Sequence, residues 1–127
     1  VGSEMCIRDR IRSTLFQRRE RFAQLREALT SPRTVFHIVL TAERLPVLES
    51  SEFHADLTSN GVRVGSMLVN RRTPADQGEF LAARRAAEDE ALALLRAKLP
   101  QTPVREVPWL PEEVGTPRAV GKLAAYL

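Results

Sequence analysis

The sequence has 127 residues, of which 43% are hydrophobic and 28% are charged. This length suffices for one folded domain with its own core, and the composition is that of an ordinary globular protein. No apolar run approaches the roughly 20 residues that a membrane-spanning helix requires. The single cysteine, Cys6, excludes an internal disulfide and favours a reducing compartment, so we expect a cytoplasmic protein.

The formal net charge of +3 is concentrated in one segment. Residues 11–29 carry five Arg and two Glu, and the rest of the chain is balanced. Aromatic residues make up only 6% of the sequence and do not alternate with basic ones. A solvated helix face explains the arginines more simply than a nucleic-acid interface, so we expect no nucleic-acid partner.

Residues 1–10 do not have the pattern of a domain start. Their sequence resembles the translated ends of assembled environmental reads. We therefore expect residues 1–10 to be a non-native leader and assign residues 11–127 to the folded part.

The first half of the chain predicts a helix, a strand and a helix. Apolar residues at steps of three and four predict a helix over residues 11–29, and a β-rich run predicts a strand over residues 34–40. This run does not alternate, so we expect the strand to be covered on both faces. Pro46 fits the first turn of the next helix, which Asn60 and Gly61 close.

The second half continues the alternation. Residues 62–70 predict a central buried strand, residues 77–98 a long helix, residues 104–107 a short strand and residues 117–126 a closing helix. The apolar face predicted for the long helix consists of Phe80, Ala83, Ala87, Ala91, Leu94 and Leu95. Alternating strands and helices predict an α/β fold with a parallel sheet and flanking helices. Three strands are few for such a sheet, so we expect a piece of a larger domain.

Residues suited to ligand contact follow the carboxyl ends of two predicted strands. Asn70 follows the central strand, and its amide offers the donor and acceptor that an adenine edge requires. Pro108, Trp109 and Leu110 follow the last strand and form a stiff apolar loop that suits a flat ring. From the residues alone, a turn role for Asn70 and a core role for Trp109 are the simpler interpretation, and the ligand-contact interpretation stays open beside it.

Recognisable catalytic patterns are missing from the sequence. It has no G-x-x-x-x-G-K-[ST] loop, no Cys/His metal spacing and no nucleophile elbow. His37 falls within a predicted strand and His54 within a predicted helix, where structural roles are more common than catalytic ones. We therefore assign no catalytic residue and no metal ligand.

Taken together, four motifs resemble the C-terminal part of the ArsA-type ATPases, the family of arsenite-pump ATPases and tail-anchored-protein targeting factors. Residues 36–45 (FHIVLTAERL) are similar to the family's strand followed by T-x-P-E, and residues 48–50 (LES) to its E-T pair. Residues 68–71 (LVNR) resemble V-V-N-R, and residues 107–114 (VPWLPEEV) resemble V-P-L-x-x-E-V. The order and spacing of the four make the resemblance specific.

The resemblance implies the C-terminal portion of a doubly wound P-loop NTPase-type domain that works as a nucleotide-driven dimer, either a homodimer or a tandem pair. It implies ATP or ADP with Mg²⁺ as ligands, adenine contacts from Asn70 and residues 108–110, and a nucleotide or dimer network that includes Glu49 and Arg71. The phosphate-binding loop and catalytic Asp of the family lie upstream of these motifs.

Two functions follow as expectations. The first is the adenine-recognition part of an ATPase that drives anion export or membrane-protein targeting with a membrane-protein partner. Gly78 and Leu81 stand where eukaryotic-type targeting factors carry a C-x-x-C, so we expect no bridging zinc. The second is a non-catalytic α/β interaction module that docks through the Arg-rich helix of residues 11–29.

Overall fold

The computed structural model describes residues 2–127 and divides into two compact units, with the boundary between Thr34 and Val35. The first unit consists mainly of α1 (Gly2–Thr30), which begins earlier than the predicted residue 11. Residues 3–10 contain neither Gly nor Pro, so nothing in them interrupts the helix. Large apolar residues of the predicted helix, including Phe16 and Phe22, are exposed. The assignment of residues 1–10 as a non-native leader stays a prediction.

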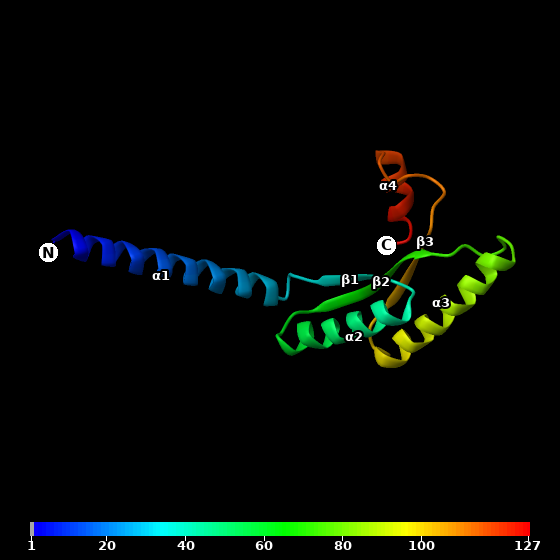
Figure 1. Cartoon of the computed structure of the whole chain (residues 1–127), viewed down its shortest axis with the longest axis horizontal. Helices are drawn as coiled ribbons and strands as arrows, with labels where there is room; N and C mark the ends of the chain where they lie inside the picture. Colours follow the sequence, from blue (N-terminus) through cyan, green and yellow to red (C-terminus); the bar gives the residue numbers. More distant parts are fainter. Residues whose placement is uncertain (1) are drawn as a thin grey trace. The chain divides into compact units, whose positions relative to one another are not determined.

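The second unit is an α/β layer structure (Figure 1). Its elements follow in the order β1 (Phe36–Thr41), α2 (Arg44–Ser59), β2 (Val64–Arg72), α3 (Glu79–Lys98), β3 (Val104–Pro108) and α4 (Pro117–Ala124). The three strands are parallel and lie in the order β1-β2-β3. This confirms the predicted fold class and the central place of the strand that ends near Asn70.

The turn between α2 and β2 explains how the central strand starts. Gly61 has φ of 79°, a conformation that glycine adopts without a steric penalty. Its N–H donates to the Thr58 carbonyl at 3.1 Å, and the Val62 N–H donates to the Leu57 carbonyl at 3.0 Å. This pair of bonds ends α2 in a Schellman motif, as the Asn-Gly sequence predicted.

The core lies between one face of the sheet and the two helices α2 and α3, which lie on the same side of it (Figure 1). Inward-facing residues of the strands pack against apolar residues of both helices, and burial of this kind is the main stabilising term of a domain. The core residues are Ile38, Leu40, Ala42, Val47, Met67, Val69, Ala91, Leu92 and Leu95.

Two expectations about burial were wrong. In β1, Ile38 and Leu40 are buried but His37 is exposed and Val39 is 62% exposed, because α2 and α3 cover the opposite face. In α3, Phe80 is 81% exposed. The buried face of α3 consists of Glu88, Ala91, Leu92 and Leu95, so a charged residue occupies a position that the apolar pattern did not predict.

The hydropathy of the helices was compared with that of membrane-spanning segments. Among residues 2–127, no helix has both the length and the apolar character that a bilayer crossing demands.

Candidate functional site

A cavity of about 520 Å³ lies at the carboxyl ends of β2 and β3. Its volume falls within the range of small-molecule sites, roughly 300–1,000 Å³. The residues that line it are Asn70, Arg71, Pro108, Trp109, Leu110, Glu112, Glu113, Val114 and Leu123. Every residue that the sequence assigned to base contact thus borders one cavity, together with Arg71. Glu49 does not line it and is exposed on α2.

A β-bulge at the end of β2 shapes the first wall. Val69 pairs with Glu106 and Arg72 pairs with Pro108, so β2 contains one more residue than β3 over this stretch. Arg71 is the extra residue. Its φ of 54° is a left-handed conformation, which costs a non-glycine residue about 1 kcal/mol or more. As a result Arg71 faces solvent together with Asn70, and Arg72 is buried.

The Asn70 side-chain amide is held by the backbone of the next residue. Its Oδ1 accepts a hydrogen bond from the Arg71 N–H at 2.9 Å, which fixes the orientation of the amide. Oδ1 keeps a second lone pair and Nδ2 carries two N–H groups. Asn70 can therefore still accept one hydrogen bond and donate another to a bound molecule.

The second wall is the loop after β3. The Trp109 N–H donates to the Arg72 carbonyl at 2.9 Å, which joins this loop to the end of β2. Trp109 is 58% exposed, so it does not fill the core of the second unit. It also borders a second cavity of about 570 Å³ with Pro74, Gln77, Leu81 and Tyr126. The indole is therefore open to contact from a ligand.

The rim of the cavity comes from α4 and the segment before it. Thr116 caps α4, because its Oγ1 accepts a hydrogen bond from the Ala119 N–H at 3.2 Å. Lys122 Nζ lies 2.6 Å from Glu112 Oε1, an ion pair that ties α4 to the loop. Leu123 of the same helix lines the cavity.

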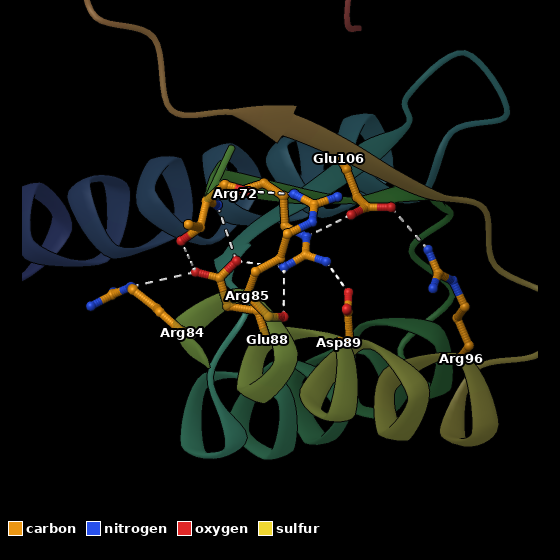
Figure 2. Close-up of polar contacts among 8 residues, drawn as sticks. Arg72, Arg84, Arg85, Glu88, Asp89, Arg96 and Glu106 are labelled. Atoms are coloured by element: carbon orange, nitrogen blue, oxygen red, sulfur yellow. Dashed lines mark hydrogen bonds and ion pairs between the residues drawn. The ribbon is translucent and has the colours of Figure 1, made fainter. Parts of the chain in front are cut away.

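Next to the bulge lies an ionic cluster around a buried arginine, which the sequence analysis missed (Figure 2). Arg72 is 4% exposed and sits between α3 and β3. Its Nε donates to Glu106 Oε1 at 2.7 Å and its Nη1 donates to Glu88 Oε2 at 2.5 Å. Its Nη2 forms an ion pair with Asp89. Three carboxylates thus surround one guanidinium.

Glu88 links this cluster to the turn after β2. Its Oε2 accepts a hydrogen bond from the Thr73 N–H at 3.0 Å, and the Thr73 hydroxyl donates to Oε1. Burial by itself would raise the pKa of Glu88, but the hydrogen bonds from Thr73 and Arg72 outweigh it and the pKa is lowered. Burial would likewise lower the pKa of Arg72, yet Glu106, Glu88 and Asp89 raise it overall. Both side chains are therefore charged at neutral pH.

The two histidines lie outside this region and contact hydroxyl groups. His37 Nδ1 is 2.8 Å from Ser66 Oγ, and His54 Nε2 is 3.0 Å from Thr102 Oγ1. Neither lines the cavity at the ends of β2 and β3. Within residues 2–127, no cluster of three or more His, Cys, Asp or Glu residues has a geometry suited to a metal ion.

Comparison with known proteins places the chain in a family. Residues 3–127 match the family model of the anion-transporting ATPases (ArsA). The chain is also 32% identical over 101 residues to a protein of Aquifex aeolicus (strain VF5) that is named as an arsenical pump-driving ATPase, and the match covers 79% of this chain and 33% of that relative. The chain thus spans about a third of the length of the curated relative it matches. It belongs to the anion-transporting ATPase (ArsA) family.

Proposed function

We propose that residues 11–127 are the C-terminal, adenine-recognition portion of an ArsA-type ATPase. In its intact form this ATPase binds and hydrolyses ATP with Mg²⁺ to drive anion export or membrane-protein targeting. The observation that carries the proposal is the shared cavity, because Asn70 and residues 108–110 come from separate strands and border the same space. Ligands of open α/β sheets bind outside the carboxyl ends of the strands, which is where this cavity lies.

The chemistry of Asn70 favours adenine over guanine. An adenine edge offers a ring nitrogen that accepts and an amino group that donates, which match Nδ2 and the free lone pair of Oδ1. Guanine offers two acceptors on the corresponding edge, so its O6 would face Oδ1 without a proton between them. Pro108 and the exposed indole of Trp109 supply flat apolar surfaces against which the ring can stack.

The phosphate end of the nucleotide requires groups that this sequence does not contain. Phosphoryl transfer needs a phosphate-binding loop with its Lys and a bound Mg²⁺ to stabilise the transferring group. The 127-residue chain is therefore expected to bind adenine nucleotides weakly and not to hydrolyse ATP. A magnesium-dependent turnover by the purified chain would contradict this expectation.

Assembly and location form part of the same proposal. A homodimer or tandem pair in the cytoplasm, with Glu49 and Arg71 in its nucleotide or dimer network, fits a nucleotide-driven switch that acts on a membrane-protein partner. The exposed position of Glu49 on α2 leaves its carboxylate accessible to such a second domain.

The lone tryptophan provides the test. Titration of the chain with ADP should quench Trp109 emission saturably at millimolar nucleotide, and GDP should be less effective. Asn70→Ala should abolish the difference between the two nucleotides. Asn60→Ala, which removes an exposed amide at the end of α2, should leave it unchanged. Equal quenching by ADP and GDP in all three proteins would refute adenine recognition.

One observation favours a second candidate function, that of an interaction module. The apolar side chains of α1 are exposed beside its arginines, including Phe16 and Phe22. On this view residues 11–29 dock on an acidic partner and the sheet is a scaffold. A chain that is folded but gives no Trp109 response to millimolar ADP would favour the module over the ATPase portion.

A further inference from the structure

The bulge at the end of β2 leaves Arg71 exposed to solvent and Arg72 buried in the protein. In a regular strand, side chains alternate, so Arg72 would share a face with Asn70. The extra residue reverses this alternation, and Arg72 is buried although Asn70 and Arg71 are both exposed. Asn70 follows the buried Val69 in regular alternation, so the effect of the bulge is to add Arg71 to the exposed residues and to give Arg72 an anchor in the protein interior.

Arg72 is also the point where the two walls of the cavity meet. The first wall, Asn70 and Arg71, lies directly before it in the chain. The second wall begins at its carbonyl, which accepts the Trp109 N–H at 2.9 Å, and Arg72 pairs with Pro108 in the ladder. A shift of the Arg72 backbone would thus move both walls together.

The side chain of Arg72 is held from three directions (Figure 2). Glu106 comes from β3, and Glu88 and Asp89 come from successive positions of α3. Each carboxylate meets a different nitrogen of the guanidinium: Nε, Nη1 and Nη2 respectively for Glu106, Glu88 and Asp89. A planar fork with several donors suits this arrangement, whereas the single ammonium of a lysine cannot reach three acceptors in the same geometry.

We propose that Arg72, clamped by Glu88, Asp89 and Glu106, is a positioning residue that sets the spacing between Asn70 and the Trp109 loop. For a nucleotide this inference rests on the proposed adenine site. The clamp itself acts on the protein with or without a ligand. It predicts that a loosened Arg72 frees the Trp109 backbone and reduces discrimination between adenine and guanine, with the rest of the sheet unchanged.

The first experiment needs no ligand. Amide hydrogen exchange is measured by NMR for Trp109 and for Met67, whose N–H donates to the Pro103 carbonyl at the other end of the same strand pair. In Arg72→Lys, exchange of the Trp109 amide should rise about tenfold relative to that of Met67, the effect of losing roughly one supporting hydrogen bond. Equal acceleration of both amides, or acceleration of neither, would overturn the proposal.

A matched control contacts the same carboxylate. Arg96 Nη2 lies 3.2 Å from Glu106 Oε2, so Arg96→Lys perturbs Glu106 without touching Arg72. It should leave the Trp109-to-Met67 exchange ratio at the wild-type value, and a change equal to that of Arg72→Lys would refute a specific role for Arg72. If Arg72→Lys does not fold, Glu106→Gln, which removes the charge from one arm of the clamp, takes its place with the same readouts.

The second experiment uses ADP and GDP as probes, followed by Trp109 emission. The ratio of the two dissociation constants should fall in Arg72→Lys toward one and stay unchanged in Arg96→Lys, whereas a purely structural role would lower stability and leave this ratio intact. A preserved ratio in Arg72→Lys would therefore refute positioning of the site. If the wild-type protein does not respond to ADP, the adenine proposal fails, and the exchange ratio still decides the role of the clamp.

Discussion

The buried pair of Arg72 and Glu88 allows a quantitative prediction of stability. Both residues are almost fully buried, at 4% and 5% exposure, and their nearest charged atoms are 2.5 Å apart. Removing one partner of such a pair leaves an uncompensated buried charge, which costs about 3–5 kcal/mol. Arg72→Met should therefore lower the free energy of unfolding by that amount, a large part of the roughly 5–15 kcal/mol that stabilises a typical domain.

The double variant separates pairing from packing. In Arg72→Met/Glu88→Met neither charge is left in the interior, so the combined loss should be smaller than the sum of the two single losses by about 0.5–3 kcal/mol. Asp89, another partner of Arg72, is exposed and can regain water in these variants. Urea unfolding followed by circular dichroism and Trp109 emission gives the four free energies of the cycle.

The control for this cycle is Arg84→Met. Arg84 Nε lies 3.5 Å from Oε1 of the buried Glu88, but the Arg84 side chain itself is 55% exposed, and ion pairs of solvent-exposed side chains contribute about 0–1 kcal/mol. Its loss should be correspondingly small. Strictly additive effects of Arg72→Met and Glu88→Met, or a loss below about 1 kcal/mol for Arg72→Met, would refute the reasoning.

Three further predictions concern acid stability, core packing and the bulge. The pKa of Glu88 is lowered in the folded state, so the ionised Glu88 contributes its full stabilisation of the fold above its unfolded pKa of about 4.3 and should lose it as the pH falls through the folded pKa. Glu88→Gln should flatten the dependence of the unfolding free energy on pH in this range. An unchanged dependence would contradict the lowered pKa of Glu88. Val69→Ala, at a fully buried position, should cost about 2 kcal/mol or more in urea unfolding, whereas Val39→Ala on the exposed face should stay within about 0.5 kcal/mol. Arg71→Val places a β-branched residue at φ of 54° and should cost roughly 1–3 kcal/mol, whereas Arg105→Val, at an exposed position of β3, should cost little. Equal thermal shifts of the two variants would argue against strain at the bulge.

The order of elements could be predicted because each boundary carries its own chemical signal. Asn60 and Gly61 predicted the end of α2, and the left-handed φ of Gly61 explains the choice of residue. The apolar run after it predicted the central strand. The residues predicted to contact a base were chosen by the rule that ligands bind beyond the carboxyl ends of parallel strands. They border one cavity, and their contact with a base stays a prediction.

The ionic cluster could not be predicted because apolar periodicity treats every charged residue as exposed. Glu88 has the helical spacing of a core position relative to Ala91, Leu92 and Leu95, but its charge hides this. Its partner Arg72 comes from a strand end whose alternation is reversed by a bulge, and a bulge of one residue leaves no local pattern in Asn-Arg-Arg-Thr. The exposure of Val39 was missed for another reason, because its sequence neighbours predict only that a strand is apolar and not which faces the helices cover.

The bulge at the end of β2, the ionic cluster around Arg72 and the cavity are structurally linked. A strained Arg71 would not persist unless the surrounding structure fixed it, and the anchors on either side do so: Asn70 Oδ1 accepts its N–H, and Arg72 is bound by three carboxylates. The same anchors hold the end of β2 at a constant distance from the loop after β3. A buried ion pair adds little net stability compared with apolar packing, but it specifies one geometry. A fixed geometry suits the proposed adenine site, and this explains why the clamped Arg72 lies directly beside the exposed Asn70 and Arg71.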